Sequence, residues 1–189
     1  MTSTLRLIIA RHGHSSMSAP SDLERPLSQE GLAQARDLGG RLAGWPKAWR
    51  PQLILVSPAR RTRETLEQLT GAWPELAAAE TLCAEELYLG APEAWLERLA
   101  PLTGERTVLC VGHNPGLSDL VGALAGSYES LSVAEAVGLT LSGAGGAEGA
   151  EGAEGAASSS WAEAPSRRWR LEGRACGRAT GRGAGRAEG

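Results

Sequence analysis

The chain has 189 residues, a formal net charge of −3 and 42% hydrophobic residues, which suits one α/β domain plus additional sequence. No stretch approaches the roughly 20 apolar residues of a membrane-spanning helix, and the uncharged start does not resemble a signal peptide. These features argue against a membrane or secreted protein, and three cysteines without metal-binding spacing favour a reducing, cytoplasmic setting.

Strands and helices are predicted to alternate along the first 142 residues. Short apolar runs at 5–10, 53–56, 107–111 and 137–141 predict strands. Apolar residues at helical spacing predict helices at 28–44, after Pro58 through Leu69, from Pro92 through Leu99 and from Leu117 through Leu124. Strands separated by single helices imply a mostly parallel sheet covered on both faces, so the expected fold is a three-layer α/β/α sandwich.

The C-terminal part changes composition. Residues 143–160 consist of Gly, Ala, Glu and Ser, which predicts a flexible, disordered insertion within a domain that spans residues 1–172. A last antiparallel edge strand is expected around 168–171, with Trp161 and Trp169 anchoring it. From residue 173 to residue 189 the chain is rich in Gly and Arg, and we expect a disordered tail there.

Polar residues that suit phosphate chemistry follow three of the predicted strands. These are Arg11, His12 and Gly13, the cationic segment 57–65, and the segment 112–115. Taken alone, each segment could also be an ordinary strand end that carries polar side chains on the protein surface. Because parallel strands end at one edge of a sheet, however, two histidines and two arginines can converge there. Such a pocket suits a dianionic phosphoryl group and needs no metal to hold its charge.

The three segments in this order resemble the histidine phosphatase superfamily, also called phosphoglycerate-mutase-like. Their motifs read Arg11-His12-Gly13, Ser57-Pro58-x-x-Arg61-x-x-Glu64-Thr65 and Gly112-His113-Asn114-Pro115. The small size and the segment Pro26–Ala35 are most similar to the SixA-type phosphohistidine phosphatase branch. The resemblance covers residues 5–142 and resumes weakly at 161–171, and it implies the phosphoglycerate-mutase-like fold.

The resemblance also implies roles for individual residues. His12 would become the phosphohistidine intermediate, and Arg11, Arg61 and His113 would bind the phosphoryl oxygens. No metal or other cofactor is implied. Further contacts to phosphate or substrate are expected from Gly13, Ser15 and Asn114.

The proton donor is less defined by the sequence. Glu85 and Glu86 lie in about the right interval, although two adjacent glutamates also suit a solvated loop that carries charge. An imidazole leaving group has a pKa of about 6.5, so a P–N bond breaks with little acid assistance. If the site lacks a proton donor, phosphohistidine is therefore favoured as the substrate over a phosphate ester.

Three functions follow as hypotheses. The first is a phosphatase acting on phosphohistidine in a protein, and the second is a phosphatase acting on a small phosphorylated metabolite. The third is a non-enzymatic protein whose Gly-Arg tail binds nucleic acid, but this tail lacks the interleaved aromatic residues of such segments. We expect a monomer that binds neither membrane nor nucleic acid.

Overall fold

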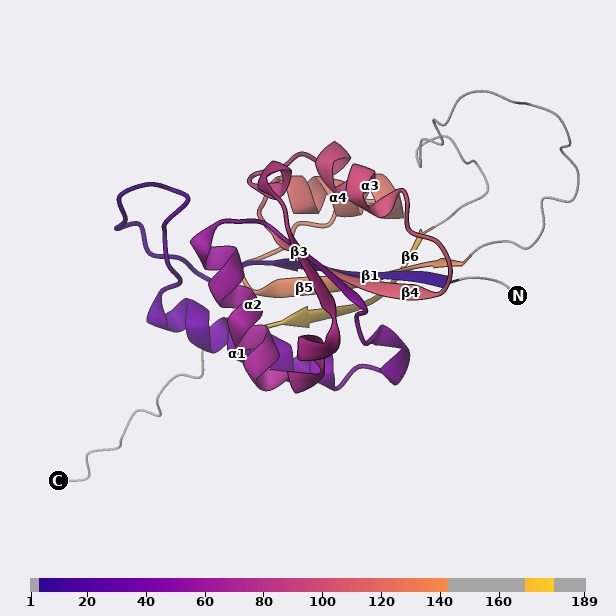
Figure 1. Cartoon of the computed structure of the whole chain (residues 1–189), viewed down its shortest axis with the longest axis horizontal. Coiled ribbons are helices and arrows are strands. Elements are labelled where there is room, and N and C mark those ends of the chain that lie inside the picture. Colours follow the sequence, from indigo (N-terminus) through magenta and orange to yellow (C-terminus); the bar gives the residue numbers. More distant parts are fainter. Residues whose placement is uncertain (1–3, 143–168, 179–189) are drawn as a thin grey trace, which may run out of the picture.

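A six-stranded sheet forms the middle layer of the computed structural model, which describes residues 4–142 and 169–178 (Figure 1). Strands β1 to β4 are parallel to one another, β5 runs antiparallel to its neighbour β1, and β6 pairs antiparallel with β5, so the expected α/β/α sandwich is confirmed. The spatial order is β3-β2-β4-β1-β5-β6. The strands are β1 (Thr4–Arg11), β2 (Leu53–Val56), β3 (Glu80–Cys83), β4 (Arg106–Gly112), β5 (Glu135–Ser142) and β6 (Trp169–Cys176).

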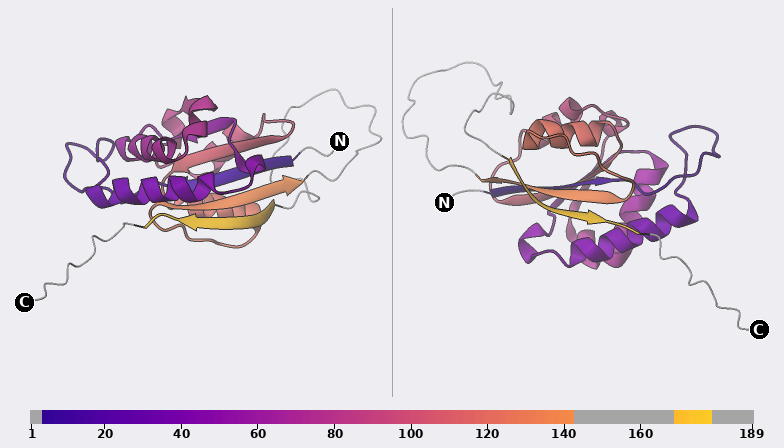
Figure 2. Two further views of the ribbon diagram at one scale, coloured as in Figure 1. Left: turned by 90° about the horizontal axis from the view of Figure 1, so that it is seen from below. Right: turned by 180° about the vertical axis from the view of Figure 1, so that it is seen from behind.

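Helices cover both faces of the sheet (Figure 2). One face carries α1 (Gln29–Ala43) and α2 (Arg60–Ala72), and the other carries α3 (Pro92–Leu99) and α4 (Gly116–Ala125). Ser28 caps α1, because its side chain accepts a hydrogen bond from the backbone N–H of Gly31. Short 3₁₀ turns lie at Lys47–Trp49, Pro74–Ala78 and Glu85–Leu87. Within the described part of the chain, no helix is long and apolar enough to cross a membrane.

The central strand β1 shows why residues 7–10 form an uninterrupted apolar run. It lies between β4 and β5, and its side chains point alternately into the two layers of core. Leu7 and Ile9 pack under α3 and α4, whereas Ile8 and Ala10 pack under α1 and α2. All four are fully buried, so the strand needs apolar residues on both faces and positions its last residues firmly at the sheet edge.

Two features differ from the sequence-based expectations. Strand β3 was not predicted, because all four of its residues are exposed at the sheet edge and lack an apolar pattern. Strand β6 is the expected antiparallel edge strand, but it continues to Cys176, so the expectation of a disordered tail from residue 173 is wrong for its first residues. Backbone pairing with β5 does not require large side chains, and Gly173 lies against Trp45.

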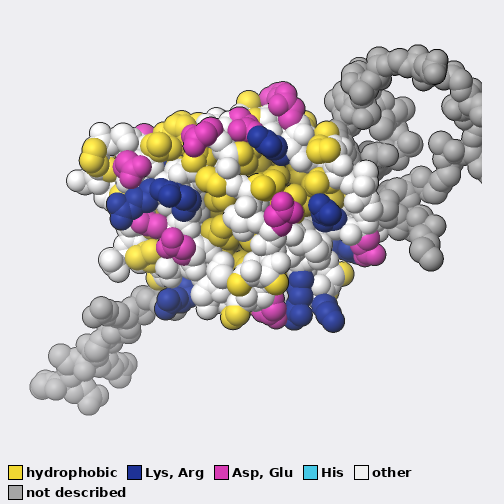
Figure 3. Space-filling model, in the orientation of Figure 1, with side chains coloured by type: hydrophobic (Ala, Val, Ile, Leu, Met, Phe, Trp, Pro, Cys, Tyr) yellow, Lys and Arg dark blue, Asp and Glu magenta, His cyan; other side chains and the backbone are white. Residues whose placement is uncertain are grey.

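Trp169 packs, partly buried, against the core on the α3 and α4 side, in agreement with its expected anchoring role. The predicted insertion at 143–160, Trp161 and the remainder of the tail at 179–189 lie outside the described residues. Basic side chains with acidic neighbours gather on the left of the molecule in Figure 3, toward the loop that joins β1 to α1.

Candidate active site

The three predicted segments meet in one cavity at the carboxyl edge of the parallel strands. His12 directly follows β1, Arg61 lies in the first turn of α2 after β2, and His113 directly follows β4. The cavity has a volume of about 410 Å³. Its wall is formed by Arg11, His12, His14, Ser15, Met17, Asp22, Arg25, Arg61, Leu89, His113, Asn114 and Val133.

His12 is buried and held in one tautomer. Its Nδ1 lies 2.7 Å from the carbonyl oxygen of Gly13, and because a carbonyl can only accept, Nδ1 carries the proton. Burial, reinforced by the nearby charges of Arg61, Arg11 and Arg25, lowers the pKa of His12 to about 4. At neutral pH the ring is therefore uncharged, and Nε2 keeps a lone pair available for attack.

His113 lies beside His12, with 5.2 Å between the ring centroids. Its Nε2 forms a 2.7 Å hydrogen bond with the fully buried hydroxyl of Ser57, which fixes the orientation of the ring. Burial and the neighbouring His12 and Arg61 lower its pKa to about 3. The two histidines are therefore both neutral, and the positive charge of the cavity comes from arginines.

Arg11 and Arg61 supply cations from two different strand ends. Arg11 donates from Nη1 to the carbonyl oxygen of Leu131 at 2.9 Å, and burial lowers the pKa of its guanidinium. The side chain of Arg61 is only 4% exposed. It donates from Nη1 to the carbonyl oxygen of Asp22 at 2.6 Å and from Nη2 to Oδ2 of Asp22 at 3.0 Å.

Asp22, Arg25 and Tyr88 belong to the same charged cluster, although none of them lies in one of the three sequence motifs. Arg25 donates to Oδ1 of Asp22 at 2.9 Å, and the hydroxyl of Tyr88 donates to Oδ2 at 2.6 Å. Hydrogen bonds from Tyr88, Arg25 and Arg61 hold the pKa of Asp22 well below its usual range. The Asp22 carboxylate raises the pKa of Tyr88 in turn. The cavity therefore contains a permanent anion among its cations.

Of the remaining predicted contacts, Ser15 and Asn114 line the cavity and Gly13 does not, and other protein groups already engage all three. Gly13 donates its N–H to Oγ1 of Thr65 at 3.2 Å, and a Cβ at this position would lie 2.6 Å from the carbonyl oxygen of Gly31. Glycine is thus required for the close approach of this loop to α1. The hydroxyl of Ser15 accepts from Arg25 at 2.9 Å, and the amide of Asn114 donates to the carbonyl of Leu131 at 2.7 Å.

The structure does not bring the expected proton donors into the cavity. Glu85 and Glu86 lie exposed in a 3₁₀ turn, and neither contributes to the cavity wall. Glu86 instead forms an ion pair with Arg98 on α3. The wall does contain His14, which the motifs did not indicate and whose Nδ1 lies 2.8 Å from the hydroxyl of Ser28. Loops carry these residues, and the path of a loop cannot be read from spacing along the chain. Spacing alone therefore did not show that His14 lies in the cavity wall and that Glu85 and Glu86 lie outside it.

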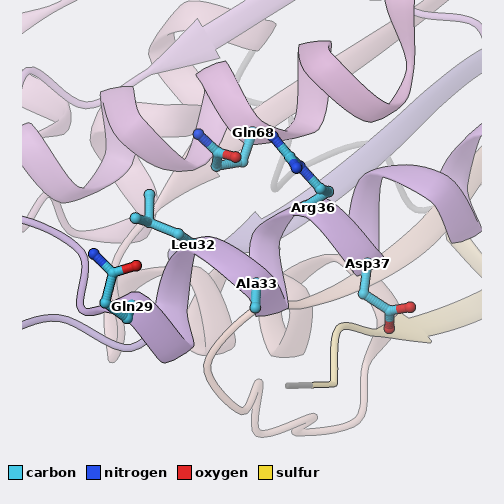
Figure 4. Close-up of a pocket in the computed structure, with 6 residues that line it drawn as sticks. All are labelled: Gln29, Leu32, Ala33, Arg36, Asp37 and Gln68. Carbon is cyan, nitrogen blue, oxygen red and sulfur yellow. The ribbon is translucent and has the colours of Figure 1, made fainter. Parts of the chain in front are cut away.

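A larger groove of about 650 Å³ runs along α1 and α2, with one lining residue contributed by α2 (Figure 4). It carries a single cation and a single anion and no nucleophile, so it does not share the chemistry of the histidine cavity. Its lining residues are Gln29, Leu32, Ala33, Arg36, Asp37 and Gln68. Within residues 4–142 and 169–178, no three His, Cys, Asp or Glu side chains are grouped to hold a metal ion.

Comparisons with known proteins agree with this geometry. The family model of the histidine phosphatase superfamily (branch 1) matches residues 7–93. An uncharacterized chloroplastic protein of Arabidopsis thaliana is 31% identical over 182 residues, which cover 89% of this chain and 76% of that protein. The phosphohistidine phosphatase SixA of Escherichia coli K12 is 31% identical over 127 residues, which cover 64% of this chain and 74% of SixA.

A solved structure of the protein histidine phosphatase SixA in complex with tungstate has the same fold. It is 28% identical to this chain, with a TM-score of 0.63, and the match covers 71% of this chain and 86% of the SixA chain.

Proposed function

The chain belongs to the histidine phosphatase superfamily and is a phosphatase, and from this premise we propose that it hydrolyses phosphohistidine in a protein through a phosphohistidine intermediate on His12. The mechanism rests on the state of His12. Its ring is neutral, its Nδ1–H donates to the carbonyl oxygen of Gly13, and its Nε2 therefore has a lone pair for attack. The nucleophile is thus prepared before the substrate arrives.

In the first step, Nε2 of His12 attacks phosphorus while the P–N bond of the substrate breaks. The substrate imidazole reacts with its other ring nitrogen already protonated. The electron pair of the P–N bond returns to the nitrogen that held phosphorus, and the ring leaves as neutral imidazole. In the second step, water attacks phosphorus and the P–Nε2 bond breaks. The electron pair returns to His12, the product is inorganic phosphate, and a proton from the water passes to phosphate or solvent.

The charge of the cavity supports this transfer. Arg11, Arg25 and Arg61 contribute three positive charges and Asp22 one negative charge, so these four side chains carry a formal charge of +2. The neutral His12 and His113 add none. A dianionic phosphoryl group matches that charge. Arginine also suits the equatorial oxygens of a phosphoryl group in transfer, because its donors form a planar fork.

The choice of a P–N bond rests on the carboxylates near the cavity. Asp22 is held in its ionised form by three donors, and Glu86 is engaged by Arg98 outside the cavity. Neither is placed to protonate an alkoxide, which is a poor leaving group. An imidazole leaves without such help because its pKa is about 6.5. At the mouth, Met17 is 81% exposed and Leu89 is 55% exposed, and such apolar side chains suit contact with a protein substrate.

The test compares three substrates on the full chain: a phosphohistidine protein, p-nitrophenyl phosphate and a sugar phosphate. We expect turnover to be fastest on the phosphohistidine protein and slowest on the sugar phosphate. Rapid quenching with radioactive substrate should trap a label on the enzyme that is lost in acid. A clear preference for the sugar phosphate would instead support the small-metabolite alternative.

The role of His12 has its own test. His12→Ala should abolish both turnover and labelling. The variant should still unfold in a cooperative transition in denaturant, which shows that the loss of activity is not a loss of folding. His12→Gly with added imidazole should regain turnover without a covalent label, because free imidazole then acts as the nucleophile. Full activity of the His12→Ala variant would refute the mechanism.

A further inference from the structure

The Asp22 carboxylate occupies the cations that a phosphoryl group would use. Both terminal nitrogens of Arg61 donate to Asp22, one to its carbonyl oxygen and one to its carboxylate. Arg25 donates to the other carboxylate oxygen. In the structure, an anion of the protein itself is therefore bound where the proposed function places the anion of the substrate.

The two partners differ in burial. The Arg61 side chain is 4% exposed, whereas the Asp22 side chain is 44% exposed and lies in the loop between β1 and α1. Arg61 is thus a fixed, buried cation, and Asp22 covers it from the solvent side. An incoming anion reaches Arg61 from the same cavity that Asp22 lines.

Asp22 is also secured as an anion. The hydroxyl of Tyr88 donates to Oδ2 at 2.6 Å, in addition to the two arginines. Because these three donors all favour the charged form, Asp22 does not escape the repulsion of a nearby dianion by taking up a proton at neutral pH. Any phosphate in the cavity must compete with this carboxylate for arginine donors and be repelled by its charge.

We propose that Asp22 is an internal competing anion that limits how tightly the cavity holds phosphate and so promotes release of the product. This inference rests on the proposed function, in which inorganic phosphate is the second product. Without Asp22 the three arginines would carry a formal charge of +3, one more than the phosphoryl dianion neutralises. With Asp22 the charges balance, and the carboxylate can take the arginine donors back when phosphate leaves.

The chain offers a matched control on the same loop. Glu24 is two residues away, exposed and absent from the cavity wall, so Glu24→Gln removes the same charge without removing a contact to Arg61. Asp22→Asn keeps the shape of the side chain and removes its charge. Asp22→Ser removes both the charge and the carboxylate contacts, and it serves as a second variant if the amide finds a new partner.

The experiment measures binding of inorganic phosphate to the full chain by calorimetry at pH 7.5, with competitive inhibition by phosphate as a second readout. We expect the dissociation constant to fall about 10- to 100-fold in Asp22→Asn and Asp22→Ser, as removal of one like charge at close range predicts. Glu24→Gln should change the dissociation constant less than about twofold, because Glu24 is exposed and outside the cavity wall, where solvent and salt screen its charge. In the Asp22 variants kcat should fall together with KM, since product release becomes slower.

Two results would overturn the inference. Weaker phosphate binding in both Asp22 variants would show that Asp22 positions Arg61 for its ligand instead of competing with that ligand. Equal binding in the Asp22 variants and in Glu24→Gln would show that Asp22 does not act at the phosphate site. Phosphate binding requires no turnover, so a wild-type chain that binds phosphate but leaves phosphohistidine intact would count against the proposed substrate alone.

Discussion

Mild acid should destabilise the folded chain, because two of its histidines are buried in their neutral form. The pKa of His12 is lowered to about 4 and that of His113 to about 3, whereas an unfolded histidine titrates near 6.5. Between about pH 6.5 and pH 4, these histidines are protonated in the unfolded chain but stay neutral in the folded chain. The contribution to stability is therefore complete above about pH 6.5 and is lost progressively as the pH falls toward the folded pKa values.

The expected size follows from those pKa values. Lowering the pH from 7 to 5 should reduce the free energy of unfolding by about 2 kcal/mol for each of these two histidines. The carboxylates of Asp22 and Asp37 also have lowered pKa values, but an unfolded aspartate takes up protons only near pH 4. The window from pH 6.5 to pH 5 therefore reports mainly on His12 and His113.

Denaturant unfolding at a series of pH values would measure this loss, and calorimetry in buffers of different ionisation enthalpy would count the protons taken up. At pH 5.5 these two histidines should contribute about two protons on unfolding. His12→Asn should remove about half of that pH dependence. A wild-type stability that stays flat from pH 7 to pH 5, or a His12→Asn variant with an unchanged slope, would refute the assignment of buried neutral histidines.

Two further predictions concern metal dependence and helix packing. Phosphatase activity should survive treatment with EDTA, because arginines supply the positive charge; a loss that a divalent ion restores would contradict this. Gly39→Ala should destabilise the chain by about 1–3 kcal/mol in denaturant unfolding, since its Cβ would lie 2.9 Å from the carbonyl oxygen of Leu69 on α2. Gly40→Ala, with open space around the added Cβ, should stabilise α1 by about 0.5–1 kcal/mol, and equal effects at both glycines would show that α1 and α2 do not pack so closely.

The central part of the fold was predictable because burial on both faces leaves a strong signal. Strand β2 and the central residues 7–10 of β1 and 108–111 of β4 are uninterrupted apolar runs, and the helices between these strands have a clear apolar face. The edges were less predictable for the same reason. Strand β3 buries none of its side chains, and β6 pairs through a segment that includes Gly173. At these edges backbone hydrogen bonds define the strand, and composition carries little information about them.

The convergence of the catalytic candidates was also predictable, because it depends on topology. His12, Arg61 and His113 each follow a parallel strand of one sheet, so their meeting requires only that the strands are parallel and adjacent. The charged cluster around Asp22 depends on a different kind of contact. Asp22 is separated by 39 positions from Arg61 and by 66 from Tyr88, and it lies in a loop whose path the sequence does not specify.

The comparison of Asp22 with Glu86 shows what decides the chemistry of a loop carboxylate here. Both are acidic residues outside regular helices and strands, both are substantially exposed, and both pair with an arginine. The arginine partner of Asp22 is a buried cation in the first turn of α2, at the cavity, whereas the partner of Glu86 lies on α3, outside it. Spacing along the sequence offered Glu85 and Glu86 as possible acids, but the position of the arginine partner puts Asp22, and not these glutamates, at the proposed phosphoryl site. A carboxylate held there as an anion cannot donate a proton and acts through its charge, which agrees with the proposed substrate, whose imidazole leaves without a proton from the enzyme.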